Sequence, residues 1–263
     1  MAVEKSDGTV LTRDEMDAAL AGTRTFTGRL FTAALALDEA DFSAVAFVDC
    51  RFEGLALHGV NFSEARFANC RFLGMRFASC DFGEAEFAKC VFFDAETKTG
   101  CAFSFCEMRA VQMRDCNFAD GAFERCDLYG VKAKACSFRG VRFKGTRFEK
   151  AMSRKVVLYA AAFEACNFSY ADLSGLTLRR CEMTGCKFSE TLFWDADLTD
   201  AVLTGSIIDR AEWDRAHLSG ADLTGASVAG LNLATLADYA GLKISQSQQH
   251  ELLREIGVDV RPD

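Results

Sequence analysis

The chain has 263 residues, half of them hydrophobic, and a formal net charge of −8 at pH 7. Its N-terminal sequence lacks the apolar stretch of a signal peptide, and it contains no run of 18 apolar residues that could span a membrane. We therefore expect a cytoplasmic protein without membrane contact, whose twelve cysteines stay reduced.

Residues 1–35 are predicted to form an N-terminal cap with a short helix. The segment Thr12-Arg13-Asp14-Glu15 has the pattern of a capping box, in which two side chains satisfy free backbone N–H groups at the helix start. The helix should continue through about Ala21. We expect a cap because a repetitive structure would otherwise end in unpaired strand edges.

From residue 36 to residue 235 a large apolar residue recurs at every fifth position. These centres run from Leu37 to Phe92 and, one residue out of step, from Phe103 to Leu233, where only Ala133 and Ser153 depart from the pattern. In an extended segment residues i and i−2 point to the same side, so each centre can face inward together with the residue two positions before it. If the chain then turns a corner, each unit forms one short face of a solenoid, and 39 units make nearly ten coils.

All twelve cysteines occupy the position two residues before a centre, where alanine and valine stand in most other units. A buried thiol behaves as a slightly enlarged alanine, so we interpret these cysteines as part of the core rather than as disulfide, metal or redox groups. Their twenty-residue spacing, as in Cys50, Cys70 and Cys90, suggests four faces per coil.

The repeat has two weak points, and loops on a rigid scaffold are good candidates for function. In the loop at residues 93–100, Thr97 replaces a centre and the register shifts by one residue. On geometry alone a register-shifting bulge is the simpler interpretation. The second loop, at about residues 149–157, keeps the five-residue register but has Ser153 at a centre.

Charge is distributed unevenly along the chain. Residues 101–190 carry a net charge of +5, and residues 191–263 carry −7. Outward charges are expected on any soluble solenoid, which is the simpler explanation for both segments. The positive segment contains a basic belt formed by Lys132, Lys134, Arg139, Arg142, Lys144, Arg147, Lys150, Arg154 and Lys155. The negative segment includes Asp195, Asp197, Asp200, Asp209, Glu212, Asp214 and Asp222.

Residues 236–263 are predicted to form a C-terminal helix and tail. The helix should open at Ser245-Gln246-Ser247-Gln248 and stop at Gly257. A short strand is expected at Val258 to Val260. The apolar side of the helix is predicted to carry Leu252, Leu253 and Ile256.

The repeating units resemble those of the pentapeptide repeat proteins. Ala171-Asp172-Leu173-Ser174-Gly175 and Ala221-Asp222-Leu223-Thr224-Gly225 are similar to that family's A-D/N-L-x-x unit. The resemblance implies an all-β fold, a right-handed quadrilateral β-helix with short N- and C-terminal capping helices. Cys90 to Ser104 is similar to the first loop of the quinolone-resistance (Qnr-type) members, C-x-F-x-D-x-E-S-x-x-G-C-x-F-S, and Gly241 to Gly257 resembles their closing helix.

The Qnr-type resemblance implies a DNA-mimicking homodimer that binds a type II topoisomerase (DNA gyrase or topoisomerase IV) and protects it from quinolones or similar poisons. The dimer would join through its C-terminal ends, at Leu252, Leu253 and Ile256, and the acidic residues from Asp195 to Asp222 would form the DNA-mimicking surface. The two loops would contact the enzyme through Asp94, Glu96, Thr97, Lys98, Thr99, Met152, Ser153, Arg154 and Lys155.

No pattern of catalytic residues is present, so we expect neither an enzyme nor a cofactor. The sequence contains no Gly-rich phosphate loop, no nucleophile elbow and no C-x-x-C zinc spacing. The basic belt could indicate direct nucleic-acid binding, but no recognition fold accompanies it. We favour instead its contact with an acidic surface of the partner near the second loop. The alternative function is a non-catalytic scaffold that binds a different protein.

Overall fold

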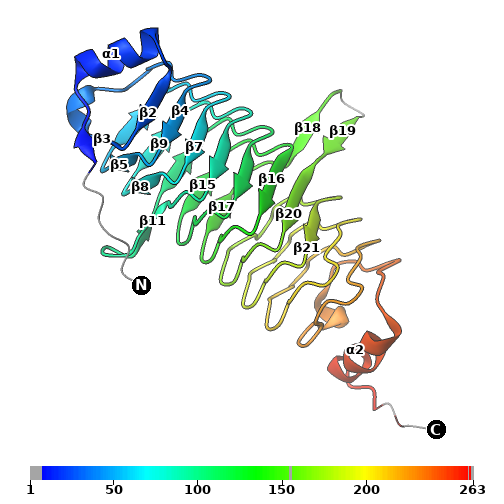
Figure 1. Cartoon of the computed structure of the whole chain (residues 1–263). Coiled ribbons are helices and arrows are strands. Elements are labelled where there is room, and N and C mark those ends of the chain that lie inside the picture. Colours follow the sequence, from blue (N-terminus) through cyan, green and yellow to red (C-terminus); the bar gives the residue numbers. More distant parts are fainter. Residues whose placement is uncertain (1–7, 154–155, 260, 262–263) are drawn as a thin grey trace.

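The protein is an elongated β-solenoid of about nine turns with a short helix near each end (Figure 1). The computed structural model describes residues 8–153, 156–259 and 261. Each regular coil takes twenty residues, as in the pairing of Phe47 with Phe67 and of Phe67 with Phe87. The predicted all-β, right-handed β-helix is confirmed.

Four faces surround the core, and we number them in the order in which the chain passes through them. Face 1 carries a parallel eight-stranded sheet: β2 (Thr25–Thr27), β4 (Ala46–Val48), β7 (Arg66–Ala68), β10 (Glu86–Ala88), β14 (Gln112–Arg114), β16 (Val131–Lys134), β20 (Ala161–Glu164) and β21 (Glu182–Thr184). Face 2 carries a four-stranded sheet: β1 (Thr9–Val10), β3 (Arg29–Phe31), β5 (Arg51–Glu53) and β8 (Arg71–Leu73).

Face 3 carries a five-stranded sheet, and face 4 is held by isolated parallel bridges such as Asp41 with Asn61. The strands of face 3 are β6 (Ala56–His58), β9 (Arg76–Ala78), β13 (Ala102–Ser104), β15 (Ala122–Glu124) and β17 (Arg142–Lys144). Toward the C-terminal end, similar bridges continue the other three faces as well, for example between Asp172 and Leu192.

Stacked phenylalanine rings fill the N-terminal two thirds of the core. Phe72 lies between Phe52, with ring centroids 4.8 Å apart, and Phe92, at 4.4 Å, in nearly parallel stacks. Rings on neighbouring faces meet edge to face, as Phe67 and Phe72 do. Both arrangements are favourable for aromatic quadrupoles, which explains why phenylalanine suits the centres.

The twelve cysteines are free and buried, as predicted. Several donate a hydrogen bond to a backbone carbonyl of the preceding coil; Cys70 Sγ, for example, lies 3.3 Å from the oxygen of Phe47. Thr191 and Ser206 occupy the same position in other coils and donate in the same way. This position therefore favours a small side chain that can donate a hydrogen bond. The sequence analysis, which treated cysteine as an enlarged alanine, did not predict this hydrogen bond.

The aspartate or asparagine that often precedes a centre stabilises the corner of the coil. Asp41 Oδ1 accepts the backbone N–H of Ser43 at 2.9 Å, and Asp172 Oδ1 accepts that of Ser174 at 3.0 Å. Such side-chain turns satisfy a backbone donor where the chain leaves the strand. Some acidic residues of this protein therefore stabilise turns of the fold, independently of any contact with a partner.

At the N-terminal end, α1 (Arg13–Ala21) begins with the predicted capping box. The Thr12 hydroxyl oxygen accepts the N–H of Glu15, and the Glu15 carboxylate accepts the N–H of Thr12. A 3-10 turn (Ala33–Leu35) follows. The parallel ladders begin before the expected boundary at residue 36, because β2 pairs with β4 and β3 with β5.

At the C-terminal end, 3-10 turns at Leu233–Thr235 and Gln246–Gln248 precede α2 (Gln249–Glu255). Ser245 and Gln248 form a capping box at the predicted helix opening. The prediction of a strand at Val258 to Val260 is wrong for Val258 and Asp259, which are exposed and belong to no strand, and Val260 lies outside the described residues. Exposed tail residues have no neighbouring strand with which to pair.

Candidate partner-binding surfaces

The first hairpin, β11 (Phe93–Asp94) with β12 (Thr99–Gly100), projects at the corner between faces 2 and 3. It follows Phe92 on face 2 and precedes Phe103 on face 3, so that Phe103 pairs with Phe77, 26 residues earlier instead of twenty. Added to Gly100, a Cβ atom would collide with the backbone of Gly121 and Ala119 in the next coil, which explains the glycine.

Polar side chains tie the tip of the first hairpin together. The Asp94 carboxylate accepts the N–H of Glu96 and the hydroxyl of Thr97, both at 2.9 Å, and the hydroxyls of Thr97 and Thr99 lie 2.7 Å apart. These donors lower the pKa of Asp94 below its usual value. Glu96, Thr97, Lys98 and Thr99 are exposed. The structure thus brings five predicted contact residues together on one ordered, polar projection.

The second hairpin, β18 (Glu149–Ala151) with β19 (Val157–Tyr159), projects at the corner between faces 4 and 1 (Figure 1). Val131 pairs with Ala161, thirty residues later, so the coil contains ten additional residues. The prediction that Ser153 occupies a centre within an unbroken register is therefore wrong. Ten residues equal two repeat units, so the insertion leaves the apparent period unchanged while Ser153 and Leu158 leave the core.

The second hairpin is apolar where the first is polar. Met152 is 58% exposed, and Val156, Val157 and Leu158 are also largely exposed. The N–H of Val156 is bonded to the Ser153 hydroxyl, which shapes the turn. The other two predicted contact residues, Arg154 and Lys155, lie outside the described residues. Apolar side chains gathered on a projecting element are characteristic of protein contact sites.

The predicted acidic surface is neither continuous nor uniformly negative. Arg215 forms two hydrogen bonds of 2.6 Å with Asp195, which lowers the pKa of that carboxyl, while Asp197 and Asp200 form ion pairs with arginines. The remaining four predicted residues lie apart: Asp209 on face 2, Glu212 and Asp214 on face 3, and Asp222 on face 1. The seven acids surround the solenoid rather than share one face.

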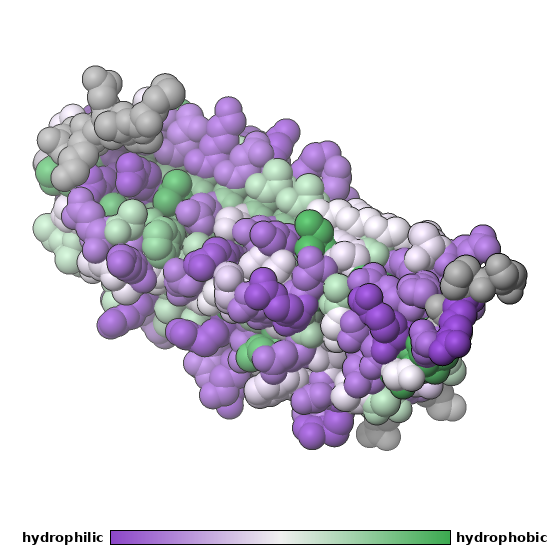
Figure 2. All heavy atoms as spheres, turned by 90° about the horizontal axis from the view of Figure 1, so that it is seen from below, coloured by the Kyte–Doolittle hydropathy of each residue, from purple (hydrophilic) through white to green (hydrophobic). Residues whose placement is uncertain are grey.

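The C-terminal end exposes a different apolar set from the one predicted. Leu252 is buried in the core of its own chain, and Leu253 is half-buried, so of the three predicted contact residues only Ile256 is exposed. Gln248 closes the last coil by donating to the carbonyls of Leu223 and Ala226. Figure 2 shows hydrophobic side chains near this end, beside hydrophilic ones. The sequence analysis missed the exposed Tyr239, Ile244 and Val258.

The described part of the chain contains no group of three or more histidine, cysteine or acidic side chains placed to hold one metal ion. No described helix has the length and apolar character needed to cross a membrane. Burial raises the pKa of the Cys101 thiol to about 12, so this side chain is a poor nucleophile.

The fold places this protein in the class of four-sided right-handed β-helices, here with two projecting hairpins. A model of the family described as pentapeptide repeats matches residues 37–74, 106–149, 158–195 and 196–233. A second pentapeptide repeat model matches residues 57–98. Because these segments make up more than half of the chain, the protein belongs to the pentapeptide repeat family.

Solved structures of other pentapeptide repeat proteins are similar to this chain. Full-length QnrB1, described as a plasmid-mediated fluoroquinolone resistance protein, superposes with a TM-score of 0.71 at 22% identity, over 79% of this chain and 97% of QnrB1. A trypsin-treated variant of QnrB1 gives 0.68 at 24% identity, over 79% and 99%. HetL, from the cyanobacterium Nostoc sp. strain PCC 7120, gives 0.47 at 16% identity, over 88% and 91%. A search of curated proteins finds no match.

Proposed function

We propose that this protein binds a type II topoisomerase, DNA gyrase or topoisomerase IV, and protects it from quinolones or similar poisons. The role is non-catalytic and cytoplasmic. The observation that carries the proposal is the likeness to QnrB1 over 97% of that protein's length, in a solenoid that also presents two projecting hairpins. QnrB1 is described as a fluoroquinolone resistance protein.

The two hairpins are the proposed enzyme contacts, and their chemistry differs. The first offers an ordered polar tip around Asp94, and the second offers the apolar side chains of Met152, Val156 and Leu158. Buried apolar anchors supply most of the affinity of a protein interface, whereas polar contacts supply specificity. We therefore assign the larger share of binding free energy to the second hairpin.

DNA mimicry enters the proposal in a narrower form. The rod carries a net charge of −8, of which residues 191–263 contribute −7. A homodimer joined at the C-terminal ends, through Ile256, Tyr239, Ile244 and Val258, would bring two such segments together. Because Asp195, Asp197 and Asp200 are paired with arginines, we expect a weaker field than their number alone indicates.

A supercoiling assay with purified gyrase, with and without a quinolone, tests the proposal. Addition of the protein should restore supercoiling in the presence of the drug, and direct binding should weaken as salt concentration rises, because surface charges are screened. A folded protein that neither binds gyrase or topoisomerase IV nor relieves drug inhibition would exclude the proposed function.

The second candidate function is a scaffold for a different protein. The local neutralisation of three predicted acidic residues favours it, since a DNA mimic has no evident need for those arginines. An affinity purification from the native cell that recovers another protein in stoichiometric amounts, with no topoisomerase, would support this alternative.

A further inference from the structure

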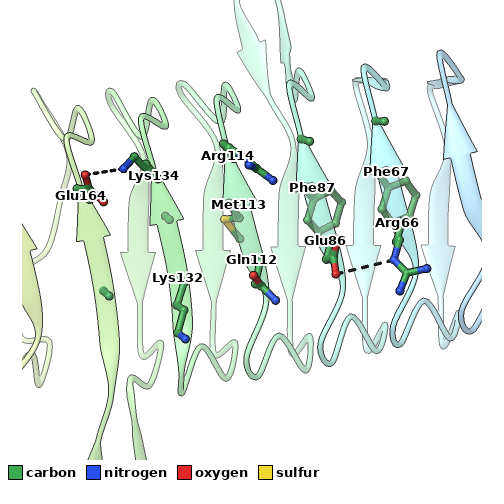
Figure 3. A pocket seen from close by; sticks show the side chains of 14 residues that line it. Arg66, Phe67, Glu86, Phe87, Gln112, Met113, Arg114, Lys132, Lys134 and Glu164 are labelled. Carbon is green, nitrogen blue, oxygen red and sulfur yellow. Dashed lines mark hydrogen bonds and ion pairs between the residues drawn. The ribbon is translucent and has the colours of Figure 1, made fainter.

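Face 1 contains a trough of about 540 Å³ that runs across β7, β10, β14, β16 and β20 (Figure 3). The floor of the trough is recessed because the outward-facing side chains of Ala68, Ala88 and Ala162 are short, whereas the other outward-facing side chains that line the trough are longer. Five parallel strands at the usual spacing give it a length of about 19 Å. This length matches about six residues of extended polypeptide at roughly 3.3 Å per residue.

The trough has an excess of positive charge on a protein that is negative overall. Arg66 and Glu86 approach to 3.8 Å, and Lys134 and Glu164 form an ion pair of 2.7 Å, so these four charges compensate one another. Arg114 on β14 and Lys132 on the adjacent β16 are exposed and form no ion pair with any described residue. Both line the middle of the trough, where Figure 3 shows them on neighbouring strands.

Two hollows connect the trough to the foot of the second hairpin, where Arg179 and Arg180 are paired with Asp197 and Asp200. A hollow of about 260 Å³ shares Lys132 and Ala162 with the trough and is bounded by Tyr159 of β19 and by Arg180. A further hollow of about 300 Å³ shares Tyr159 and Arg180 and adds Arg179. A ligand in the trough would therefore lie beside the hairpin that carries the exposed apolar residues.

We propose that the trough binds an acidic, extended segment of the protein partner, with carboxylates held by Arg114 and Lys132. The inference rests on the proposed function in that the partner which supplies this segment is the topoisomerase. It also corrects the predicted basic belt. Lys132 and Lys134 face the trough, whereas Arg142 and Lys144 lie on face 3 and Arg147 on face 4.

A peptide carboxylate fits this surface better than a nucleic-acid strand does. Phe67 and Phe87 are buried beneath the floor, so the trough presents no ring on which bases could stack. Glu86 stands on the N-terminal side of the two free cations and Glu164 on the C-terminal side. A strand with a phosphate at every nucleotide would meet both carboxylates, whereas a peptide can carry its charges in the middle alone.

The first test uses labelled hexaglutamate and fluorescence anisotropy at low salt, with a neutral Gly-Ser hexapeptide and a six-residue oligo(dT) as comparison probes. The trough variant combines Arg114→Glu with Lys132→Glu. The matched control combines Arg76→Glu with Lys187→Glu, two exposed cations on faces 3 and 2. We expect the trough variant to lose at least about tenfold in hexaglutamate affinity and the control to stay within about twofold of the unchanged protein. Unchanged hexaglutamate affinity in the trough variant, or tighter binding of oligo(dT) than of hexaglutamate, would overturn the inference.

The second test measures binding of the same three proteins to gyrase and separates this inference from the proposed function. If the unchanged protein binds gyrase and the trough variant binds equally well, the trough does not hold a gyrase segment and the inference fails while the function stands. If the unchanged protein binds neither gyrase nor topoisomerase IV but the trough variant alone loses hexaglutamate binding, the proposed function fails and the trough belongs to another acidic partner. Loss of both binding activities in the trough variant supports both.

Discussion

The two hairpins interrupt one solenoid at diagonally opposite corners and differ in length, sequence signal and surface chemistry. The first adds six residues and exposes a hydrogen-bonded polar tip around Asp94. The second adds ten residues and exposes Met152, Val156 and Leu158. Both close as antiparallel pairs, so the parallel coils continue past them without loss of register.

This difference shows that a break in periodicity and an insertion are separate properties. Six additional residues shift a five-residue period by one, which is visible in the sequence, whereas ten residues shift it by nothing. The more apolar projection, which we expect to contribute more to binding, was therefore the less visible one. The predictions below compare the hairpins with each other and with the core that supports them.

The largest expected effect is on stability and comes from the core rather than from either hairpin. Phe72→Ala removes a ring stacked between Phe52 and Phe92 and should lower the free energy of unfolding by about 3–5 kcal/mol. Chemical denaturation followed by circular dichroism measures the loss. A loss below about 1 kcal/mol would mean that the coil collapses around the gap, contrary to the close packing that we infer.

Deletion of residues 150–159 should leave the solenoid folded and weaken topoisomerase binding about 30-fold. The deletion places Phe148 five residues before Phe163 and so restores a regular coil. The expected loss corresponds to about 2 kcal/mol from a buried apolar anchor. Binding to immobilised gyrase measures it, and the melting temperature serves as the folding control. Equal binding by the shortened protein would show that the apolar tip contacts nothing on the enzyme.

Deletion of residues 94–99 should also preserve the fold and weaken the same binding, by about tenfold. It places Phe92 five residues before Phe103, with Gly100 at the corner. The smaller loss reflects polar contacts, which contribute about 1 kcal/mol net each. The two deletions measured side by side rank the hairpins. A larger effect from this deletion than from the other would reverse the assignment.

The order of the first hairpin should depend on pH through Asp94. Its pKa is lowered in the folded protein by the N–H of Glu96 and the hydroxyl of Thr97, so the stabilisation is present above the unfolded pKa and is lost as pH falls through the folded value. Asp94→Ala should increase amide hydrogen exchange at Glu96 about fivefold at neutral pH, as expected for about 1 kcal/mol. Unchanged exchange would show that the tip is held by its backbone alone.

The smallest expected effect is an absence of thiol reactivity in the folded protein. Cys90 and Cys101 flank the first hairpin, both are buried, and burial raises the pKa of Cys101 to about 12. A thiol-reactive dye at pH 8 should label no cysteine in the folded state and all twelve after denaturation. Rapid labelling of Cys101 alone would show that the coil opens at the first hairpin. The first hairpin would then differ from the second in local stability as well as in surface chemistry.

The five-residue period predicted a solenoid correctly, whereas its right-handed, four-sided form was implied by the resemblance to pentapeptide repeat proteins. A large residue at every fifth position, with a small one two residues earlier, can bury both only when the chain turns after each unit. The capping box at Thr12 was an equally local prediction and is confirmed, whereas the capping box at Ser245 was not predicted. The apparent centres Ser153 and Leu158 were assigned wrongly, because sequence period alone does not show which coil a unit joins.

The sequence by itself determined the solenoid, its N-terminal capping box and the burial of its cysteines, since each follows from the spacing of residues a few positions apart. Only the tertiary structure decided which charges remain free. Stacking brings Arg215 onto Asp195, twenty residues away, and leaves Lys132 and Arg114 without an ion-pair partner among the described residues. The physical reason is that contacts between coils depend on the length of each coil, and two insertions change that length in the middle of the chain.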